Sequence, residues 1–585
     1  MTFQQQLKEA LLKALQALSI EEQALTRVGV TASKDLQFGD YQTNAAMMLA
    51  KGLKKNPREF AQEIIEAIEV ESLAELSIAG PGFINFQLKK EAFAQRLLEI
   101  AHDERCGVAP VKVPNKYVID FSSPNVAKPM HVGHIRSTII GDALSRITRY
   151  LGHKVITDNH IGDWGTQFGM VIWAWKQELD EEALEADPLQ ELLRLYRLAS
   201  NKSKLDDLVK NACRQELVKL QNGDLKNTQI WERAVELSKE GLQKIYDRLD
   251  VSFDYWLGES AYNDYLEETV EHLLEGGIAR ESEGAICAYS SGLLPQKKDP
   301  FMKRHPDTKE WVDFPMMIQK SDGAYNYATT DLATLDYRRE NWHPDHVLYV
   351  VDHRQSEHFA QLFDLADRQD YPAHLHHVAF GTICGKDGKP LKTRAGDLPQ
   401  LDDVLNEAVE AATAVIAEKS HLETEEEKKT LAENIGIASV KFTELSHNRM
   451  SDYNFDLDKM VALEGDTAPY LMYSYVRPRS IFRKLEQEFS VPQSVTLTED
   501  KEIHLARTLA RFAEVLPTVL DDFRPNILTT YLLELARAFH SFFEACPVLK
   551  SEGDQQVSRL TLCYATAKTL KQGLELLGIN APEKM

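Results

Sequence analysis

The chain has 585 residues, which predicts roughly three or four domains rather than one. Hydrophobic residues make up 43% of it and charged residues 27%, a balance typical of globular proteins that argues against a disordered or membrane-embedded chain. Its 90 acidic and 67 basic residues give a net charge of −23, so a nucleic-acid partner would have to be held by local basic patches.

The first 112 residues predict a small α+β domain. It begins with "MTFQQQLKEALLKALQAL", where leucines recur at helical spacing and charged residues interrupt the apolar run, so we expect an amphipathic helix and not a signal peptide. Residues 76–88, "LSIAGPGFINFQL", alternate as a strand does. No stretch reaches the roughly 18 uninterrupted apolar residues of a membrane span, and a cytoplasmic protein is expected.

A strand–helix–strand pattern begins at Lys116 and indicates a parallel sheet. "KYVIDF" predicts a short strand, apolar residues at helical spacing follow it, and "KVITDNHIGDWG" predicts a second strand and its loop. Further strands are expected at residues 346–352 and 376–383. Residues 180–250 are charged and helical, as an insertion would be. Beyond Glu464 the chain has helical periodicity to its last residue.

Six cysteines are scattered along the chain, with no CxxC pair and no histidine cluster near them in sequence. This spacing argues against a zinc site or a disulfide framework, and it favours buried free thiols. No structural metal ion is therefore expected.

Two histidines flank a glycine where the first predicted strand of the parallel sheet gives way to a helix, in "SSPNVAKPMHVGH". A helix amino terminus attracts phosphate, because it offers unpaired N–H groups and the positive end of the helix dipole. His131 and His134 can donate to phosphate oxygens, while Gly133 lets a nucleotide approach the backbone. A lone HxGH could equally be capping or surface residues. Here, however, it stands where open α/β sheets bind ligands, and Lys128 adds a positive charge.

Several further motifs accompany this one: "FGDYQTNAAM", "GPGFINF", "NHIGDWGTQFG", "SDGAYNYATTDLA", "GKDGKPLKTRAGD", "EGDTAPYLMYSYVR" and the closing "LGINAPEKM". Together they resemble the class I aminoacyl-tRNA synthetases, and among these the arginyl-tRNA synthetase family, over the whole chain. The resemblance implies an α+β amino-terminal domain at residues 1–112 that binds the tRNA D-loop. It implies a Rossmann-like catalytic domain at 113–455 with a helical insertion around 180–310, and an all-α anticodon-binding domain at 456–585.

The resemblance also implies a two-step reaction. The carboxylate of L-arginine attacks the α-phosphate of ATP, and the resulting arginyl-adenylate then passes its arginyl group to a hydroxyl at the 3′ end of tRNA(Arg). Such a site works by alignment and by stabilising charge on the phosphate. We expect Mg²⁺ to accompany ATP, arginine to be activated only when tRNA is bound, and the protein to be a monomer.

The lysines of the ATP site need separate consideration, because the family's second signature is degenerate here and reads "KPLKTR" at 389–394. By resemblance, Lys128 compensates for it and Lys392 holds phosphate, both acting in catalysis with the two motif histidines. Lys386 and Lys389 could equally serve only to keep this glycine-rich loop soluble. The residues expected to bind ATP are His131, Gly133, His134, Gly162, Gly165 and Lys392.

An arginine site needs a carboxylate where the side chain ends, since the forked N–H donors of a guanidinium match a carboxylate bidentately. By resemblance, Glu259 and Asp331 hold the guanidinium. On its own, Asp331 could equally cap the helix that begins in "YNYATTD". The residues expected to bind arginine are Ser123, Asn125, Glu259, Tyr327, Asp331 and Gln355.

Aromatic planes and cations can recognise unpaired RNA by stacking on bases and pairing with phosphates. The residues that the resemblance assigns to tRNA are Phe83 and Asn85 for the D-loop, and Tyr473, Arg477, Phe543 and Met585 for the anticodon. The family has a tyrosine where Phe543 stands, so a hydroxyl contact would be lost while stacking is kept. Core packing is an equally good interpretation of Phe543 alone.

Two other interpretations stay open. One is a different class I synthetase of the cysteinyl or glutamyl type, although no zinc-ligand cluster of the cysteinyl kind is visible and the amino-terminal domain favours the arginyl family. The other is a non-enzymatic relative that keeps the fold to bind RNA or to act as a scaffold. The intact His131, Gly133, His134, Asn125 and Asp331 argue against it, because a decayed site would have lost some of them.

Overall fold

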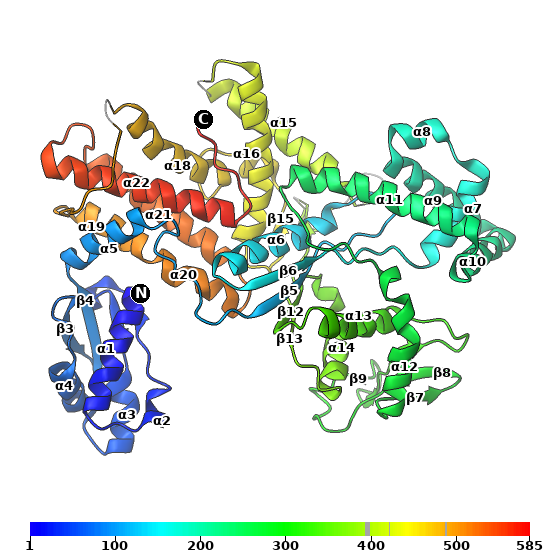
Figure 1. The fold of residues 1–585 in the computed structure, drawn as a ribbon, viewed down its shortest axis with the longest axis horizontal. Helices are drawn as coiled ribbons and strands as arrows, with labels where there is room; N and C mark the ends of the chain where they lie inside the picture. The colour runs from blue at the N-terminus through cyan, green and yellow to red at the C-terminus, as the bar shows by residue number, and fades with distance from the viewer. Residues whose placement is uncertain (386, 392–397, 420–421, 486–487) are drawn as a thin grey trace. The chain divides into compact units, whose positions relative to one another are not determined.

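A computed structural model of the full chain describes all residues except 386, 392–397, 420–421 and 486–487. The chain forms two compact units (Figure 1). The first consists of Met1–Pro110, Lys419–Leu431 and Ala462–Met585, and the second of Val111–Glu418 and Ala432–Val461. None of the helices in the described part of the chain combines the length and the apolarity needed to cross a membrane.

The second unit is built on a four-stranded sheet in the order β13-β12-β5-β6. Its strands are β5 (Lys116–Asp120), β6 (Lys154–Asp158), β12 (His346–Tyr349) and β13 (His374–His377). Each strand runs parallel to its neighbours, which confirms the predicted parallel sheet.

The strand predicted at residues 376–383 is displaced. β13 begins at His374, and the chain leaves the sheet after His377. The reason is that the backbone N–H groups of Gly381 and Thr382 bond to residues 449 and 452 instead of to β12. The chain then forms a separate parallel pair, β14 (Ile383–Cys384) with β15 (Tyr453–Asn454).

Helix α6 (Ile135–Tyr150) crosses from β5 to β6 and lies close to the sheet. Gly141 permits this approach, because a Cβ atom at that position would stand 2.2 Å from the ring of Phe121, the residue after β5. Since α6 follows "HVGH" directly, this contact fixes the motif at the carboxyl end of the sheet. A second crossover helix, α14 (Ser356–Arg368), joins β12 to β13.

The helices predicted at residues 180–250 are present, whereas strands at Ala279–Ser282, Ala285–Ala288 and Met302–Arg304 interrupt the wider helical range expected around 180–310. The helices are α8 (Glu181–Ala186), α9 (Pro188–Leu205), α10 (Asp207–Gln221) and α11 (Leu225–Arg248), which follow α7 (Thr166–Glu178). Each of these four helices begins after an aspartate whose carboxylate accepts a backbone N–H of the first turn. The four capping residues are Asp180, Asp187, Asp206 and Asp224.

The rest of the second unit surrounds the sheet. An antiparallel sheet in the order β11-β8-β7 is formed by β7 (Ala279–Ser282), β8 (Ala285–Ala288) and β11 (Met316–Gln319), and β9 (Met302–Arg304) pairs with β10 (Trp311–Asp313). The helices are α12 (Leu266–Glu275), α13 (Tyr327–Asn341), α15 (Leu401–Lys419), α16 (Glu425–Ser446, whose first residues belong to the first unit) and α17 (Leu457–Met460). Phe301, Leu332 and Val347 belong to the apolar core that α12, α13 and the β11-β8-β7 sheet share with the parallel sheet.

The amino-terminal part of the first unit is an α+β fold, as predicted. Its antiparallel sheet, in the order β1-β2-β4-β3, consists of β1 (Thr31–Ala32), β2 (Tyr41–Thr43), β3 (Ala74–Ala79) and β4 (Phe83–Leu88). Its helices are α1 (Phe3–Ala17), α2 (Glu22–Leu25), α3 (Ala45–Leu53), α4 (Pro57–Ala67) and α5 (Lys90–His102). α1 is amphipathic as expected, with Leu7, Leu11 and Leu15 fully buried. The single strand predicted at 76–88 is wrong, because Gly80 and Gly82 adopt positive φ and turn the segment into a hairpin.

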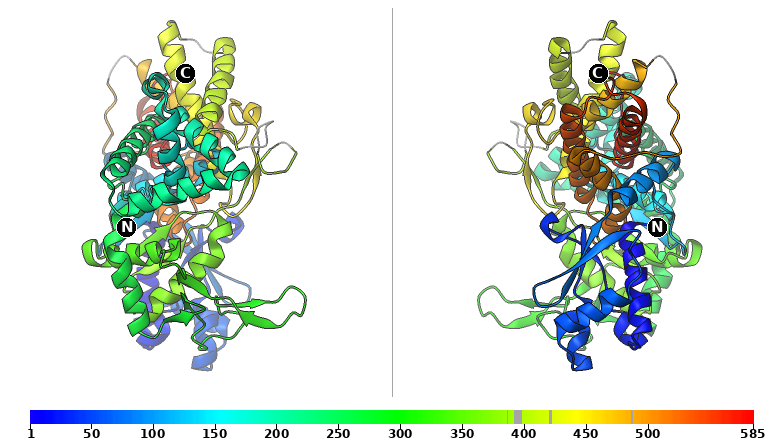
Figure 2. Two further views of the ribbon diagram at one scale, coloured as in Figure 1. Left: turned by 90° about the vertical axis from the view of Figure 1, so that its right-hand side faces the viewer. Right: turned by 90° about the vertical axis from the view of Figure 1, so that its left-hand side faces the viewer.

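The carboxyl-terminal part of the first unit is helical, which confirms the periodicity beyond Glu464 (Figure 2). Its helices are α18 (Ala468–Arg483), α19 (Asp500–Ala510), α20 (Phe512–Thr518), α21 (Asn526–Ala545) and α22 (Gly553–Leu576). All six cysteines of the chain are buried free thiols, also as predicted.

Candidate active site

The "HVGH" motif forms a single 3₁₀ turn, Val132–His134, between the end of β5 and the start of α6. The Nδ1 atom of His131 accepts the backbone N–H of Gly133, and the Nδ1 atom of His134 accepts the backbone N–H of His131, both over 3.1 Å. The two rings stack with their centres 4.0 Å apart. Because each Nδ1 accepts a hydrogen bond, each neutral ring carries its proton on Nε2 and can donate it outward.

Both motif histidines are uncharged at neutral pH. The pKa of His134 is lowered to about 3, first by burial and then by the neighbouring His131. Burial also lowers the pKa of His131, helped by the nearby ammonium group of Lys128. The pair therefore offers phosphate two neutral N–H donors and not two positive charges.

The loop between β5 and the motif holds an unusual backbone. Ser122, Ser123 and Ala127 all have positive φ, a conformation that costs free energy in residues other than glycine and is concentrated at functional sites. Gly162 lies against this loop, since a Cβ atom there would stand 2.4 Å from Oδ1 of Asn125. The "IGDWG" loop after β6 is thereby held beside the loop that follows β5.

One cavity of about 320 Å³ collects most of the predicted nucleotide and arginine residues. It is lined, among others, by Ser123, Asn125, Gly133, His134, Gly162, Glu259, Asp331 and Gln355. His131, Lys128, Gly165 and Tyr327 are not among its lining residues. Tyr327 is 61% exposed at the start of α13, and Lys128 lies over the ring of Tyr196 in α9, 4.0 Å from its centre.

The two predicted guanidinium ligands lie at the same cavity but in different environments. The pKa of Glu259 is raised to about 7, chiefly by burial and also by the carboxylates of Asp163 and Asp331, while His160 acts in the opposite direction. Asp331 stands in the second turn of α13, where its Oδ2 accepts a hydrogen bond of 2.6 Å from Nε2 of His358. The interpretation of Asp331 as a helix cap is wrong, because Asn326 caps α13.

Sequence reasoning missed a group of buried charged side chains at the cavity. The fully buried guanidinium of Arg338 bridges Asp120 at 2.6 Å and Asp158 at 2.8 Å, the last residues of β5 and β6. His160 stands close enough to these two carboxylates for the three to share a metal ion, but Arg338 already pairs with both carboxylates. The Nδ1 atom of His160 is buried with no hydrogen-bond partner among the described residues. The sequence signal was an aspartate ending each of two adjacent strands.

The segment after the second signature runs beside the "HVGH" turn. Val132 donates its N–H to the carbonyl of Pro399 over 2.9 Å, and Leu401 donates to the carbonyl of Met130 over 2.9 Å. Of the predicted signature lysines, Lys389 is described, whereas Lys392 and Lys386 lie outside the described residues.

Three of the four predicted anticodon residues gather in the first unit. The guanidinium of Arg477 lies 4.3 Å from the ring centre of Phe543 and 5.9 Å from that of Tyr473. His540, which sequence reasoning missed, joins them through a 3.1 Å contact between its Nδ1 and the guanidinium. Phe543 is half-buried rather than part of a closed core. Met585 ends a tail that is held on α18 by the ion pair of Glu583 with Arg479.

The two predicted D-loop residues lie two positions apart on β4. Phe83 is half-buried, and Asn85 is only 4% exposed. The Oδ1 atom of Asn85 has no hydrogen-bond partner in the described part of the chain.

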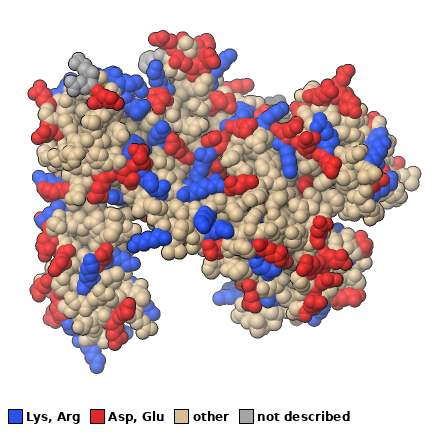
Figure 3. Space-filling view, viewed as in Figure 1, with Lys and Arg blue, Asp and Glu red and all other residues tan. Residues whose placement is uncertain are grey.

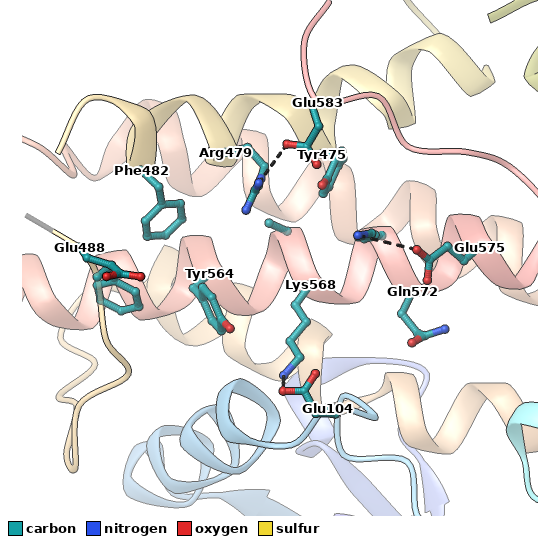
Figure 4. A pocket seen from close by; sticks show the side chains of 13 residues that line it. Glu104, Tyr475, Arg479, Phe482, Glu488, Tyr564, Lys568, Gln572, Glu575 and Glu583 are labelled. Atoms are coloured by element: carbon teal, nitrogen blue, oxygen red, sulfur yellow. Dashed lines mark hydrogen bonds and ion pairs between the residues drawn. The ribbon is translucent and has the colours of Figure 1, made fainter. Parts of the chain in front are cut away.

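A second cavity, of about 500 Å³, lies beside α18 and α22 in the same unit (Figure 4). Tyr475, Phe482 and Tyr564 give it aromatic walls, while Arg479 and Lys568 supply cations. These two cations are already paired with the carboxylates of Glu583 and Glu104, and Lys571, which also lines the cavity, pairs with Glu575.

A parallel sheet whose first crossover helix begins at an HxGH turn, with imidazole donors and buried carboxylates in one cavity, defines a class I aminoacyl-tRNA synthetase catalytic domain. The family model "tRNA synthetases class I (R), catalytic domain" matches residues 99–457. The models "Arginyl tRNA synthetase N terminal domain" and "DALR anticodon binding domain" match residues 5–88 and 471–585. The chain belongs to the arginyl-tRNA synthetase family.

Individual relatives agree with this. The arginine–tRNA ligase of Synechococcus elongatus is 43% identical over 593 aligned positions, covering 99% of both chains. The crystal structure of the Plasmodium falciparum arginyl-tRNA synthetase is 29% identical, with a TM-score of 0.79 and coverage of 100% of this chain and 99% of that one. The Thermus thermophilus arginyl-tRNA synthetase, 24% identical with a TM-score of 0.82 and full coverage of both chains, shares the fold.

Proposed function

We propose that the protein is an arginine–tRNA ligase, which couples L-arginine to tRNA(Arg) at the expense of ATP. The observation that carries the proposal is the cavity of about 320 Å³, where a neutral imidazole donor of the "HVGH" turn and the carboxylates of Glu259 and Asp331 all reach one space. Imidazole donors suit a phosphate chain, and paired carboxylates suit a guanidinium.

In the first step, a carboxylate oxygen of arginine attacks the α-phosphorus of ATP. The new P–O bond forms as the bond to pyrophosphate breaks, which leaves arginyl-adenylate and releases pyrophosphate. His131 and His134 donate from Nε2 to phosphate oxygens, and Lys128 and Lys392 add positive charge there. Gly133, Gly162 and Gly165 leave room for the nucleotide, and Mg²⁺ enters with ATP as part of the substrate.

At the arginine end, Glu259 and Asp331 hold the guanidinium, with Tyr327 beside it. Ser123, Asn125 and Gln355 bind the α-amino and neighbouring groups. A buried carboxylate that loses its forked donors is left unpaired, so citrulline and lysine are rejected without an editing step.

In the second step, the 2′- or 3′-hydroxyl of the terminal adenosine attacks the arginyl carbonyl carbon. The hydroxyl loses its proton, AMP leaves, and an ester bond to tRNA remains. For tRNA binding we assign Phe83 and Asn85 to the D-loop, and Tyr473, Arg477, Phe543 and Met585 to the anticodon. On the face drawn in Figure 3, basic side chains are interspersed with acidic ones. This mixture supports tRNA binding through stacking and local cations rather than through one broad positive surface.

Three further assignments belong to this proposal. The domain boundaries lie at residues 112 and 455, so that the helical domain begins at 456. The protein acts in the cytoplasm. It works as a monomer.

The test is pyrophosphate exchange with each of the twenty amino acids, with and without tRNA(Arg). We expect exchange with arginine alone, and only when tRNA is present, because bound tRNA favours the competent conformation of the site. Exchange driven by another amino acid contradicts the arginine assignment. An absence of exchange under every condition favours a non-enzymatic RNA-binding relative.

A further inference from the structure

Histidines gather at the amino-terminal edge of the parallel sheet, which is opposite the edge that holds the active-site cavity. His346 is the first residue of β12, and it pairs in register with His374, the first residue of β13. His376 lies two positions further along β13 and therefore on the same face as His374. The ring centre of His346 is 5.3 Å from that of His374 and 5.4 Å from that of His376.

Two of these imidazoles already have the spacing of metal ligands. Nδ1 of His346 lies 3.1 Å from Nε2 of His376. Two imidazole nitrogens that each stand about 2.0–2.1 Å from a tetrahedral ion are separated by about 3.3 Å. An ion can therefore replace the hydrogen bond between the rings with little movement of either.

The chain also supplies a partner that can orient the first ligand. The side-chain amide of Asn115 lies 3.3 Å from Nε2 of His346. An amide can present either its NH₂ group or its oxygen. With the oxygen turned inward, it accepts the Nε2 proton of His346 and leaves the Nδ1 lone pair free, as outer partners of ligating histidines commonly do.

The surroundings keep the rings in the ligating, uncharged form. The pKa of His376 is lowered to about 4, first by burial and then by the neighbouring His346 and His374. The pKa of His346 is also lowered, first by burial and then by His374 and His153, although the charge of Asp345 acts in the opposite direction. On its other side, His346 stacks on Tyr117, with ring centres 4.5 Å apart, and Tyr117 in turn touches the ring of His153.

We propose that His346, His374 and His376 form a binding site for one divalent first-row transition-metal ion, with water completing its coordination. His346 and His376 bind in their present positions. His374 is exposed, and it joins them by rotation of its side chain. Neutral imidazole ligands favour Zn²⁺, Cu²⁺ and Ni²⁺ over Mg²⁺ and Ca²⁺. The site is independent of the proposed ligase activity, because it stands at the other edge of the sheet.

The test is calorimetric titration of the full-length protein with Zn²⁺ at pH 7.5, without ATP or tRNA. We expect one site of about micromolar affinity in the wild type. His376→Ala should weaken it by about 100-fold, and His374→Ala by about tenfold, since each removes one ligand. Thermal unfolding without metal will show whether His376→Ala folds. If it folds poorly, His376→Asn takes its place.

Two histidines provide matched controls. His377 is next to His376 in β13, but its Nε2 lies 3.1 Å from the carbonyl of Val351, so His377→Gln should bind Zn²⁺ as the wild type does. His160→Ala tests the acidic cluster at the other edge of the sheet. Loss of the Zn²⁺ site in His160→Ala, or unchanged affinity in His374→Ala and His376→Ala, overturns the proposal.

Binding of Cu²⁺ gives a second, spectroscopic readout that is independent of calorimetry. The electron paramagnetic resonance spectrum of the 1:1 complex should show coupling to imidazole nitrogens in the wild type, and this coupling should be reduced in His376→Asn. A spectrum with oxygen ligands only would contradict the site.

Discussion

Asp331 carries the clearest prediction at the level of single residues. Asp331→Asn keeps the shape of the side chain and removes its charge, so the KM for arginine should rise by about 100-fold or more, while the KM values for ATP and tRNA change little. The preference for arginine over citrulline should narrow at the same time. Aminoacylation kinetics with each substrate varied in turn will check this.

Asn326 offers the matched control, because it caps the helix that carries Asp331. Asn326→Ala should lower the free energy of unfolding by about 1 kcal/mol and leave the KM for arginine unchanged. If the two variants behave alike, with lower stability and an unaltered KM, then Asp331 has only a structural role.

His358 holds Asp331 from α14, and we expect it to act as a positioning residue. His358→Ala should raise the KM for arginine, since it removes the 2.6 Å hydrogen bond that orients the carboxylate. Added to Asp331→Asn, it should have almost no further effect, because the group that it orients no longer carries charge. Fully additive effects in the double variant would show that His358 acts elsewhere.

Glu259 predicts a pH dependence for arginine binding. Its pKa is raised to about 7, and a guanidinium binds only the ionised carboxylate, so arginine affinity should fall as the pH drops from about 8 to about 6. Binding near pH 7 should release a proton, which calorimetry in buffers of different ionisation enthalpy measures. The pH dependence should disappear in Glu259→Gln, and a flat wild-type profile would refute the assignment.

Local sequence patterns predicted the site residues that stand in short motifs and missed those whose partners are far away in the sequence. The histidines of "HVGH" and the acid in "YNYATTD" stand in short motifs. Arg338 was missed, because a single arginine in a charged helix shows no sign of partners such as Asp120, which is 218 residues away. The metal-ligand histidines were missed likewise, since His346 and His376 are 30 residues apart in sequence.

Residues of α6, α16 and β15 meet in one buried cluster of the second unit. We expect this cluster to link the position of the "HVGH" turn to that of the second signature. Arg136 of α6 pairs with Glu444 of α16 at 3.0 Å, and the hydroxyl of Tyr453 in β15 donates to the same carboxylate. β15 also pairs with β14, which leads into the second signature. Tyr453→Phe should therefore lower the free energy of unfolding by about 1–3 kcal/mol, because a buried acceptor loses its donor.

The same change should slow arginine activation. Since Tyr453→Phe loosens β15 against α6, pyrophosphate exchange should show a lower kcat with an unchanged KM for arginine. Denaturant unfolding and exchange kinetics on the same preparation will check both effects. A stability loss with unaltered kcat would mean that the cluster only holds the fold together.

At the element level, the sequence predicted what depends on neighbouring residues. Helical periodicity located the insertion and the carboxyl-terminal helices. The strand predicted at 76–88 became a hairpin, because alternation of side chains does not reveal that two glycines take positive φ. The displacement of β13 depended on hydrogen bonds to residues near 450, which no local pattern encodes.

Considered as a whole, the molecule joins the two ends of its chain in one unit. Asp40 of the amino-terminal part pairs with Arg507 of α19 at 2.5 Å, and Tyr41 donates to Glu514 of α20. If the proposed D-loop and anticodon residues bind one tRNA together, the distance between the two parts that carry them must be fixed. Asp40→Asn should then raise the KM for tRNA severalfold and leave the KM values for arginine and ATP unchanged.

A double-mutant cycle with Arg507→Gln is the control for this prediction. The coupling free energy of the pair should be about 0.5–3 kcal/mol in thermal or denaturant unfolding, since the Asp40 carboxylate is buried. An unaltered tRNA KM in all three variants would mean that the pair does not fix the two parts that we propose to contact tRNA. No local pattern could predict this ion pair, because its partners are 467 residues apart.

The neutral histidines of the "HVGH" turn have a consequence for a cell whose interior acidifies. Their pKa values lie below the ordinary range, so the phosphate contacts proposed for them should persist through a fall in pH that begins to protonate Glu259. Acid stress would thus leave the nucleotide end of the cavity working while the amino-acid end loses its hold. Arginine would then be captured more poorly while the proposed contacts with ATP are kept.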